Sequence, residues 1–171
     1  MILMEETSKS QSINQANRSA APSCLTTELA IAFDTSYINH LGGKIAAINQ
    51  AISVMNTVDP NFDGAFNSNI DFQIVECFTP DEDPSQWTDT PDGGALLSNF
   101  RSWSNIGGFL QEYDLGQMWT KRNFHYDNKY GVVGLAYVST TCGSSKYHLL
   151  EHYTSGDNQS RVLTAHEIDH N

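Results

Sequence analysis

The sequence predicts an α/β domain in which helices pack on a mixed, mostly parallel and twisted sheet. Two observations carry this prediction. The length of 171 residues suits a single domain, and apolar segments of strand length alternate with amphipathic helical segments along the chain. We place the domain at residues 25–171. Residues 1–24 are polar with few large apolar side chains, so we expect a flexible leader or the end of an upstream segment.

The first half of the domain combines a buried strand with a long amphipathic helix. The apolar run at residues 29–33 predicts the strand. Apolar side chains spaced three and four residues apart predict the helix, which has Ser36 as its N-cap and ends at the Asp-Pro pair of residues 59–60. A glycine pair at residues 42–43 costs this helix about 1 kcal/mol per glycine relative to alanine. Its predicted apolar face carries Ile38, Leu41, Ile45, Ile48, Ile52 and Met55.

The second half of the domain contains shorter elements. Residues 70–78 alternate between apolar and polar side chains, which predicts a strand with one drier face. The acidic, proline-containing segment 79–92 is interpreted as a solvated loop rather than a cation site. A second amphipathic helix follows near residues 96–103, and a last helix runs from Asp157 or Asn158 to the end of the sequence. Further strands are expected at residues 115–119, 132–138 and 147–153, and a polar turn at 123–130.

The acidic composition narrows the possible partners. Nine basic and 20 acidic residues give a net charge of −11. Nucleic acids and anionic membrane surfaces attract proteins through Lys and Arg, so we expect neither as a partner. The apolar stretches are shorter than the ~18 residues of a transmembrane helix, and the first residues do not form a signal peptide. The chain is therefore either cytosolic or a piece of a longer precursor.

The chemistry lies in the H-E-x-x-H sequence at residues 166–170, which falls on the last predicted helix. His166 and His170 are one helical turn apart, so both imidazoles can reach one metal ion. Glu167 is rotated by about 100° from that row, so it can act on an attacking water without being a ligand. This set of groups predicts a Zn²⁺ site with Glu167 as general base. The competing interpretation is a helix end with two exposed histidines.

The other histidines are poorer candidates for a third metal ligand. His148 and His152 are four residues apart, but in a strand they would lie about 13 Å from each other. We therefore interpret them as exposed or loosely packed side chains. His40 and His125 are isolated in the sequence. The three cysteines, Cys24, Cys77 and Cys142, do not have the spacing of a metal site, and at most one internal disulfide can form among them.

Four segments, in order, resemble the reprolysin (adamalysin)-like branch of the metzincin zinc peptidases. They are residues 28–34, 114–122, 131–138 and 162–171, and the resemblance extends over about residues 25–171. It implies a zincin-like N-terminal subdomain, with an antiparallel edge strand beside the cleft and the active-site helix at its C-terminal end. It also implies a zinc-dependent endopeptidase with Zn²⁺ as cofactor.

The resemblance further implies how substrate binds and where the protein works. An extended peptide or protein substrate would pair with the edge strand, through Gly134, Leu135, Ala136 and Tyr137. We expect a monomer that is secreted. The position of Cys142 in the family implies a partner cysteine further along the precursor, and a buried free thiol is the alternative.

Two departures from the family pattern qualify these expectations. The family motif continues as H-E-x-x-H-x-x-G-x-x-H, whereas this sequence ends at Asn171, and Asp169 stands where glycine is usual. Catalytic zinc commonly has three protein ligands, so we expect the third ligand and the Met-turn beyond this sequence and little activity from the 171 residues alone. Two alternative hypotheses are an inactive remnant that binds peptides through its edge strand and an acidic α/β domain in which the motif is accidental.

Overall fold

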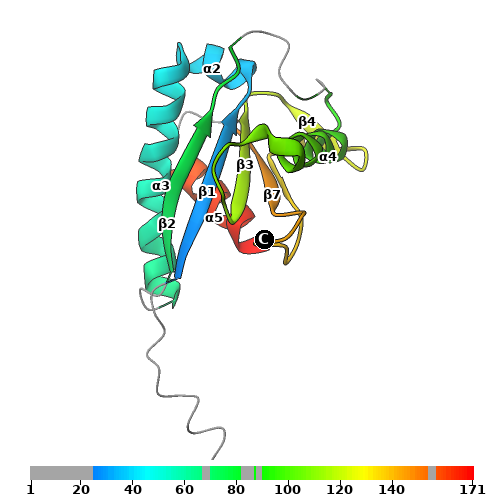
Figure 1. Cartoon of the computed structure of the whole chain (residues 1–171). Helices are drawn as coiled ribbons and strands as arrows, with labels where there is room; N and C mark the ends of the chain where they lie inside the picture. Colours follow the sequence, from blue (N-terminus) through cyan, green and yellow to red (C-terminus); the bar gives the residue numbers. More distant parts are fainter. Residues whose placement is uncertain (1–24, 67–69, 82–86, 88–89, 154–156) are drawn as a thin grey trace, which may run out of the picture.

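The computed structural model describes residues 25–66, 70–81, 87, 90–153 and 157–171, and shows the predicted α/β architecture (Figure 1). The leader expected at residues 1–24 lies outside these ranges. The elements in chain order are β1 (Leu25–Phe33), α2 (Thr35–Leu41), α3 (Lys44–Phe66), β2 (Ile70–Phe78), α4 (Gly93–Trp103), the π-helical turn η1 (Ser104–Gly108), β3 (Leu115–Thr120), β4 (Phe124–Tyr126), β5 (Lys129–Val132), β6 (Gly134–Ala136), β7 (Tyr147–Glu151) and α5 (Asp157–His170).

Five strands form the sheet, in the order β2-β1-β3-β7-β6. β1 pairs in parallel with β2 and β3, and β3 pairs in parallel with β7. β6 pairs antiparallel with β7 and lies at the edge. The mostly parallel sheet with one antiparallel edge strand is therefore confirmed. β4 and β5 form a separate antiparallel hairpin.

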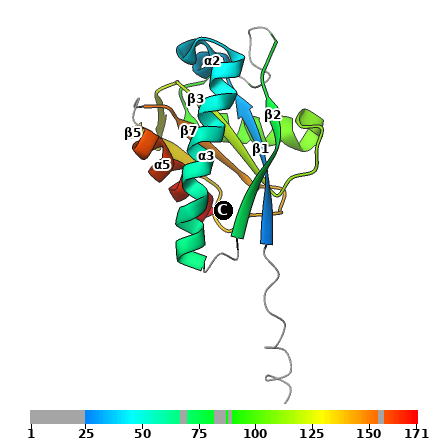
Figure 2. The same ribbon diagram turned by 90° about the vertical axis from the view of Figure 1, so that its left-hand side faces the viewer.

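The helices bury both faces of this sheet. Successive side chains of a strand point to opposite faces, so Leu29, Ile31 and Phe33 of β1 face α3 and α5, whereas Ala30 and Ala32 face α4. α3 and α5 lie side by side on their face of the sheet (Figure 2). This pairing holds α5, which carries the H-E-x-x-H sequence, beneath β7 and β6.

The single long helix expected from Ser36 to residues 59–60 is wrong, because α2 and α3 are separate helices. Gly42 ends α2 with a φ of 87°, a left-handed conformation that glycine adopts at little cost. Asp34, not Ser36, is the N-cap of α2, and its Oδ1 accepts a hydrogen bond from the Tyr37 N–H at 2.8 Å. Pro60 lies inside α3, which continues to Phe66.

Two members of the predicted apolar face, Ile45 and Ile52, are wrong, whereas Ile48 and Met55 pack in the core as expected. Ile45 is 72% exposed and Ile52 is 40% exposed. The side chains that α3 buries against the sheet are Ala47, Ala51, Val54, Met55, Val58 and Phe62. The break at Gly42 shifts the helical phase, so the three-and-four spacing that spans it marks the buried face only in part.

The remaining differences between the predicted and the observed elements concern the short strands. The apolar run at 132–138 is not one strand, because β5 ends at Val132 and β6 contains only Gly134–Ala136. The polar segment 123–130 includes a hairpin whose turn residues Asp127 and Asn128 both have positive φ, as a type I′ turn requires. Among the described residues, no helix is long and apolar enough to cross a membrane.

Candidate metal and catalytic site

α5 divides the H-E-x-x-H residues between its two faces. The face turned to the sheet buries Ser160, Leu163, Thr164, Glu167 and Ile168. His166 and His170 lie on the opposite, exposed face. Residues four apart on a helix are neighbours, and the helical setting predicted for this motif is confirmed.

The two imidazoles are arranged as a pair of ligands to one ion would be. Nε2 of His166 and Nε2 of His170 are 3.1 Å apart. Two nitrogens at about 2.0–2.1 Å from a tetrahedral zinc are about 3.3 Å from each other. These two residues therefore fit zinc in both donor type and spacing. In the part of the chain that the structure describes, no third His, Cys, Asp or Glu joins them in a metal-binding group.

Glu167 extends from α5 to the edge strand β6. Its side chain is only 4% exposed and packs directly on Gly134 of β6. Burial raises the pKa of this carboxyl from 4.5 to about 7. Glu167 and Gly134 have separate predicted roles, and their contact is not evident from the sequence. The absence of a side chain at residue 134 makes room for the carboxylate.

Replacing Gly134 by alanine is expected to displace the Glu167 side chain. A Cβ atom at residue 134 would lie 2.0 Å from Oε1 and 2.8 Å from Cγ of Glu167. Crowding of this kind destabilises a protein by about 1–3 kcal/mol, to be measured by urea unfolding. In a Glu167→Ala background the same change is expected to cost much less. Gly64→Ala is the matched control, because a Cβ there meets nothing within 4 Å. Equal effects of Gly134→Ala in both backgrounds would contradict the contact.

The predicted substrate-binding residues lie at the edge of the sheet. Gly134, Leu135 and Ala136 form β6 and pair with Leu150, Leu149 and His148 of β7, respectively. Tyr137 follows β6 and its N–H donates to the Tyr147 carbonyl at 3.2 Å. On its other side, β6 pairs with no strand within the described ranges. That side can therefore accept an extended peptide.

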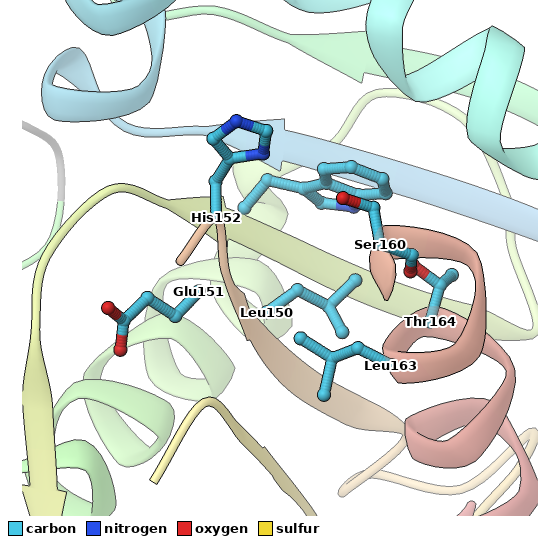
Figure 3. Close-up of a pocket in the computed structure, with 7 residues that line it drawn as sticks. Leu150, Glu151, His152, Ser160, Leu163 and Thr164 are labelled. Carbon is cyan, nitrogen blue, oxygen red and sulfur yellow. The ribbon is translucent and has the colours of Figure 1, made fainter. Parts of the chain in front are cut away.

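The expectation that His148 and His152 are exposed or loosely packed is wrong. His148 is fully buried and His152 is 7% exposed. The ring of His152 packs 5.5 Å from Tyr37 and 5.2 Å from His40, measured between centroids. His152 also lines a hollow with Glu151, Ser160 and Thr164 (Figure 3). This hollow, of about 10 Å³, has room for no more than one water molecule, so it is not a substrate pocket.

Burial of His148 predicts a loss of stability in acid. Burial, followed by the charge of His170, lowers its pKa to about 4, although the hydrogen bond to Asn171 opposes this shift. His148 is neutral in both states above the unfolded pKa of about 6.5, so its effect appears only as the pH falls from about 6.5 to 4. We expect urea unfolding at pH 4 to show an additional loss of about 3 kcal/mol relative to pH 7. A His148→Asn variant that loses as much stability in acid as the parent protein would contradict this expectation.

The described cysteines are free thiols. Cys142 is exposed, so the interpretation as a buried thiol is wrong, and its Sγ donates to Oδ1 of Asp114 at 3.4 Å. Cys77 is partly buried in β2. Cys24 lies outside the described residues. Pairing of Cys142 with a cysteine beyond this sequence stays a prediction.

The chain is similar to known proteins in sequence and in fold. A model of the reprolysin type, described as metallo-peptidase family M12, matches residues 25–171. A solved structure, titled "Structure of a chaperone-substrate complex", superposes with a TM-score of 0.62 at 17% sequence identity. The superposition covers 89% of this chain and 26% of that chain, and at this identity it shows the fold alone. No curated protein sequence matches.

Proposed function

The chain belongs to the reprolysin-like metallo-peptidases of family M12, and on that basis we propose that it is the zinc-binding part of an endopeptidase in which Glu167 is the general base. The family resemblance inferred from four sequence segments is thereby confirmed. The observation that carries the mechanism is the position of Glu167. It belongs to the helix that bears the two imidazoles, and it packs on the strand that would receive the substrate.

His166 and His170 would hold the zinc ion through their Nε2 atoms. When bound, zinc polarises the scissile carbonyl and favours loss of a proton from the attacking water. The carboxylate of Glu167 takes that proton and then donates it to the leaving amine. A pKa raised to about 7 suits both transfers near neutral pH. Three protein ligands are usual for catalytic zinc, so we propose that the third comes from outside the residues that the structure describes.

An extended peptide would bind along β6. Its main chain would pair with Gly134, Leu135 and Ala136, and Tyr137 would border it where the strand ends. Antiparallel or parallel addition of a strand gives affinity through main-chain hydrogen bonds, while side-chain pockets select the sequence. Proteins of this family are typically extracellular, and we propose a secreted peptidase acting on proteins.

Removal of the metal tests this function. In a longer polypeptide that supplies the proposed third ligand, hydrolysis of denatured, fluorescently labelled casein should be lost on treatment with 1,10-phenanthroline and restored by Zn²⁺. His166→Ala should abolish it, whereas His125→Ala, a histidine on the separate β4–β5 hairpin, should not. Zinc binding without hydrolysis would favour the peptide-binding remnant over the enzyme. If the protein neither binds zinc nor hydrolyses casein, the proposal is overturned.

A further inference from the structure

Main-chain hydrogen bonds join the C-terminal end of α5 to the segment that follows β6. The Ser139 N–H donates to the His170 carbonyl at 2.8 Å. The N–H groups of Thr140 and Thr141 donate to the main-chain oxygen of Asn171 at 2.6 and 3.0 Å. The last carbonyls of a helix lack donors within the helix, and these three groups supply them. Ser139 has a φ of 58°, which is uncommon for a residue other than glycine.

The side chain of Asn171 makes a second connection. Its Nδ2 donates to the Tyr137 carbonyl at 2.6 Å and lies 3.4 Å from the Tyr147 carbonyl. Its Oδ1 is 2.6 Å from Nδ1 of His148. Because an amide oxygen only accepts hydrogen bonds, Nδ1 of His148 carries the proton. One primary amide thus joins the end of α5 to both β7 and the residue after β6.

Burial of the His148 side chain at this position is energetically unfavourable. It is fully buried in β7, opposite Ala136 of β6. Its Nε2 is buried without a hydrogen-bond partner among the described residues. Leaving a buried polar group unpaired costs about 1–3 kcal/mol, so an apolar side chain would serve packing better. The imidazole makes a hydrogen bond to Asn171 that a leucine side chain could not make.

We propose that His148 and Asn171 are a pair of positioning residues that hold metal ligand His170 in register with the substrate strand. Neither is proposed as a metal ligand or as a residue that contacts substrate. Asn171 follows His170 directly, and it fixes Tyr137, at the end of β6, through the 2.6 Å hydrogen bond. His148 orients the Asn171 amide so that its nitrogen faces Tyr137 and its oxygen faces the imidazole. The consequence for catalysis rests on the proposed function, whereas the pair itself does not.

Two measurements on the whole chain test this proposal. The first is the affinity for Co²⁺ and Zn²⁺ by titration, and the second is hydrogen exchange of the amides of residues 139–141. Groups that orient metal ligands commonly change metal affinity by about 10–100-fold. We expect His148→Leu to weaken metal binding about tenfold or more and to speed exchange at these amides. His148→Asn, which retains an N–H donor near the position of Nδ1, should restore most of both.

Further variants make the test independent of folding defects at the buried site. Asn171→Asp keeps the acceptor for His148 but loses the donor to Tyr137, so exchange at residues 139–141 should speed up although the imidazole contact remains. Asn171→Leu and His148→Leu should together cost less than the sum of their separate effects. Additive effects, or no rescue by His148→Asn, would overturn the pairing. If the parent chain binds neither metal, the proposed function fails, and the exchange measurements alone decide whether the pair holds the helix end.

Discussion

Replacing Asp34 by alanine is expected to destabilise the domain by about 3–5 kcal/mol, as is typical when one partner of a buried ion pair is removed. The carboxylate is fully buried, and its Oδ2 accepts hydrogen bonds from Nε of Arg122 at 2.7 Å and from the Thr120 hydroxyl at 2.5 Å. Its Oδ1 accepts from the Ser36 hydroxyl at 2.6 Å and from the Tyr37 N–H. One side chain therefore joins the end of β1, the first turn of α2 and the end of β3.

Urea unfolding at neutral pH measures this effect. Asp81→Ala is the matched control, because Asp81 also pairs with a cation, Lys44 at 2.8 Å, but its side chain is 98% exposed. Ion pairs in solvent contribute little to stability, so the control should be nearly unchanged. Asp34→Asn should fall between the two, since it keeps the shape and one acceptor oxygen but loses the charge and the other acceptor. If Asp34→Ala and Asp81→Ala unfold at similar urea concentrations, the hydrogen bonds and ion pair of the buried Asp34 do not hold these elements together.

Glu167→Gln is expected to lower kcat/KM for a peptide substrate by about 10²–10⁴-fold, the contribution of a positioned general base. Glutamine has nearly the same shape, so its packing on Gly134 is retained. It cannot take a proton from water at neutral pH. Metal affinity should therefore stay close to that of the parent protein, which separates this variant from His166→Ala.

Asp169→Asn is the control for this experiment. Asp169 is a carboxylate on the same helix, two residues further along, and it is exposed. Its replacement should leave kcat/KM within a few-fold of the parent value. Full activity of Glu167→Gln, combined with loss of activity on chelation, would mean that another group is the base.

The sequence was sufficient to predict the main strands of the sheet and the helix that carries H-E-x-x-H, but not the separation of α2 from α3 or the β4–β5 hairpin. H-E-x-x-H is a local pattern, and the spacing of its histidines depends only on helical geometry. An edge strand over residues 131–138 was expected from the family resemblance; its place in the sheet is confirmed, although the strand contains only Gly134–Ala136. The break at Gly42 was not expected, because the apolar spacing continues across it although the helical phase does not.

The parts of the site that could not be predicted all depend on contacts between distant segments. Glu167 meets Gly134 across 33 positions of sequence, and His148 meets Asn171 across 23. Alternation along a strand cannot show that His148 is buried, since β7 is covered on both faces. The contacts of His148 and of Gly134 can be recognised only once the order of the strands in the sheet is known.

The shortness of β6 has a consequence for turnover. Three residues span about 10 Å of extended chain, so only a few main-chain hydrogen bonds can hold a peptide at this edge. If this edge binds peptides as proposed, a product held by so few bonds would dissociate readily and allow the next substrate to enter. The same brevity gives other copies of the domain little open edge on which to stack and aggregate.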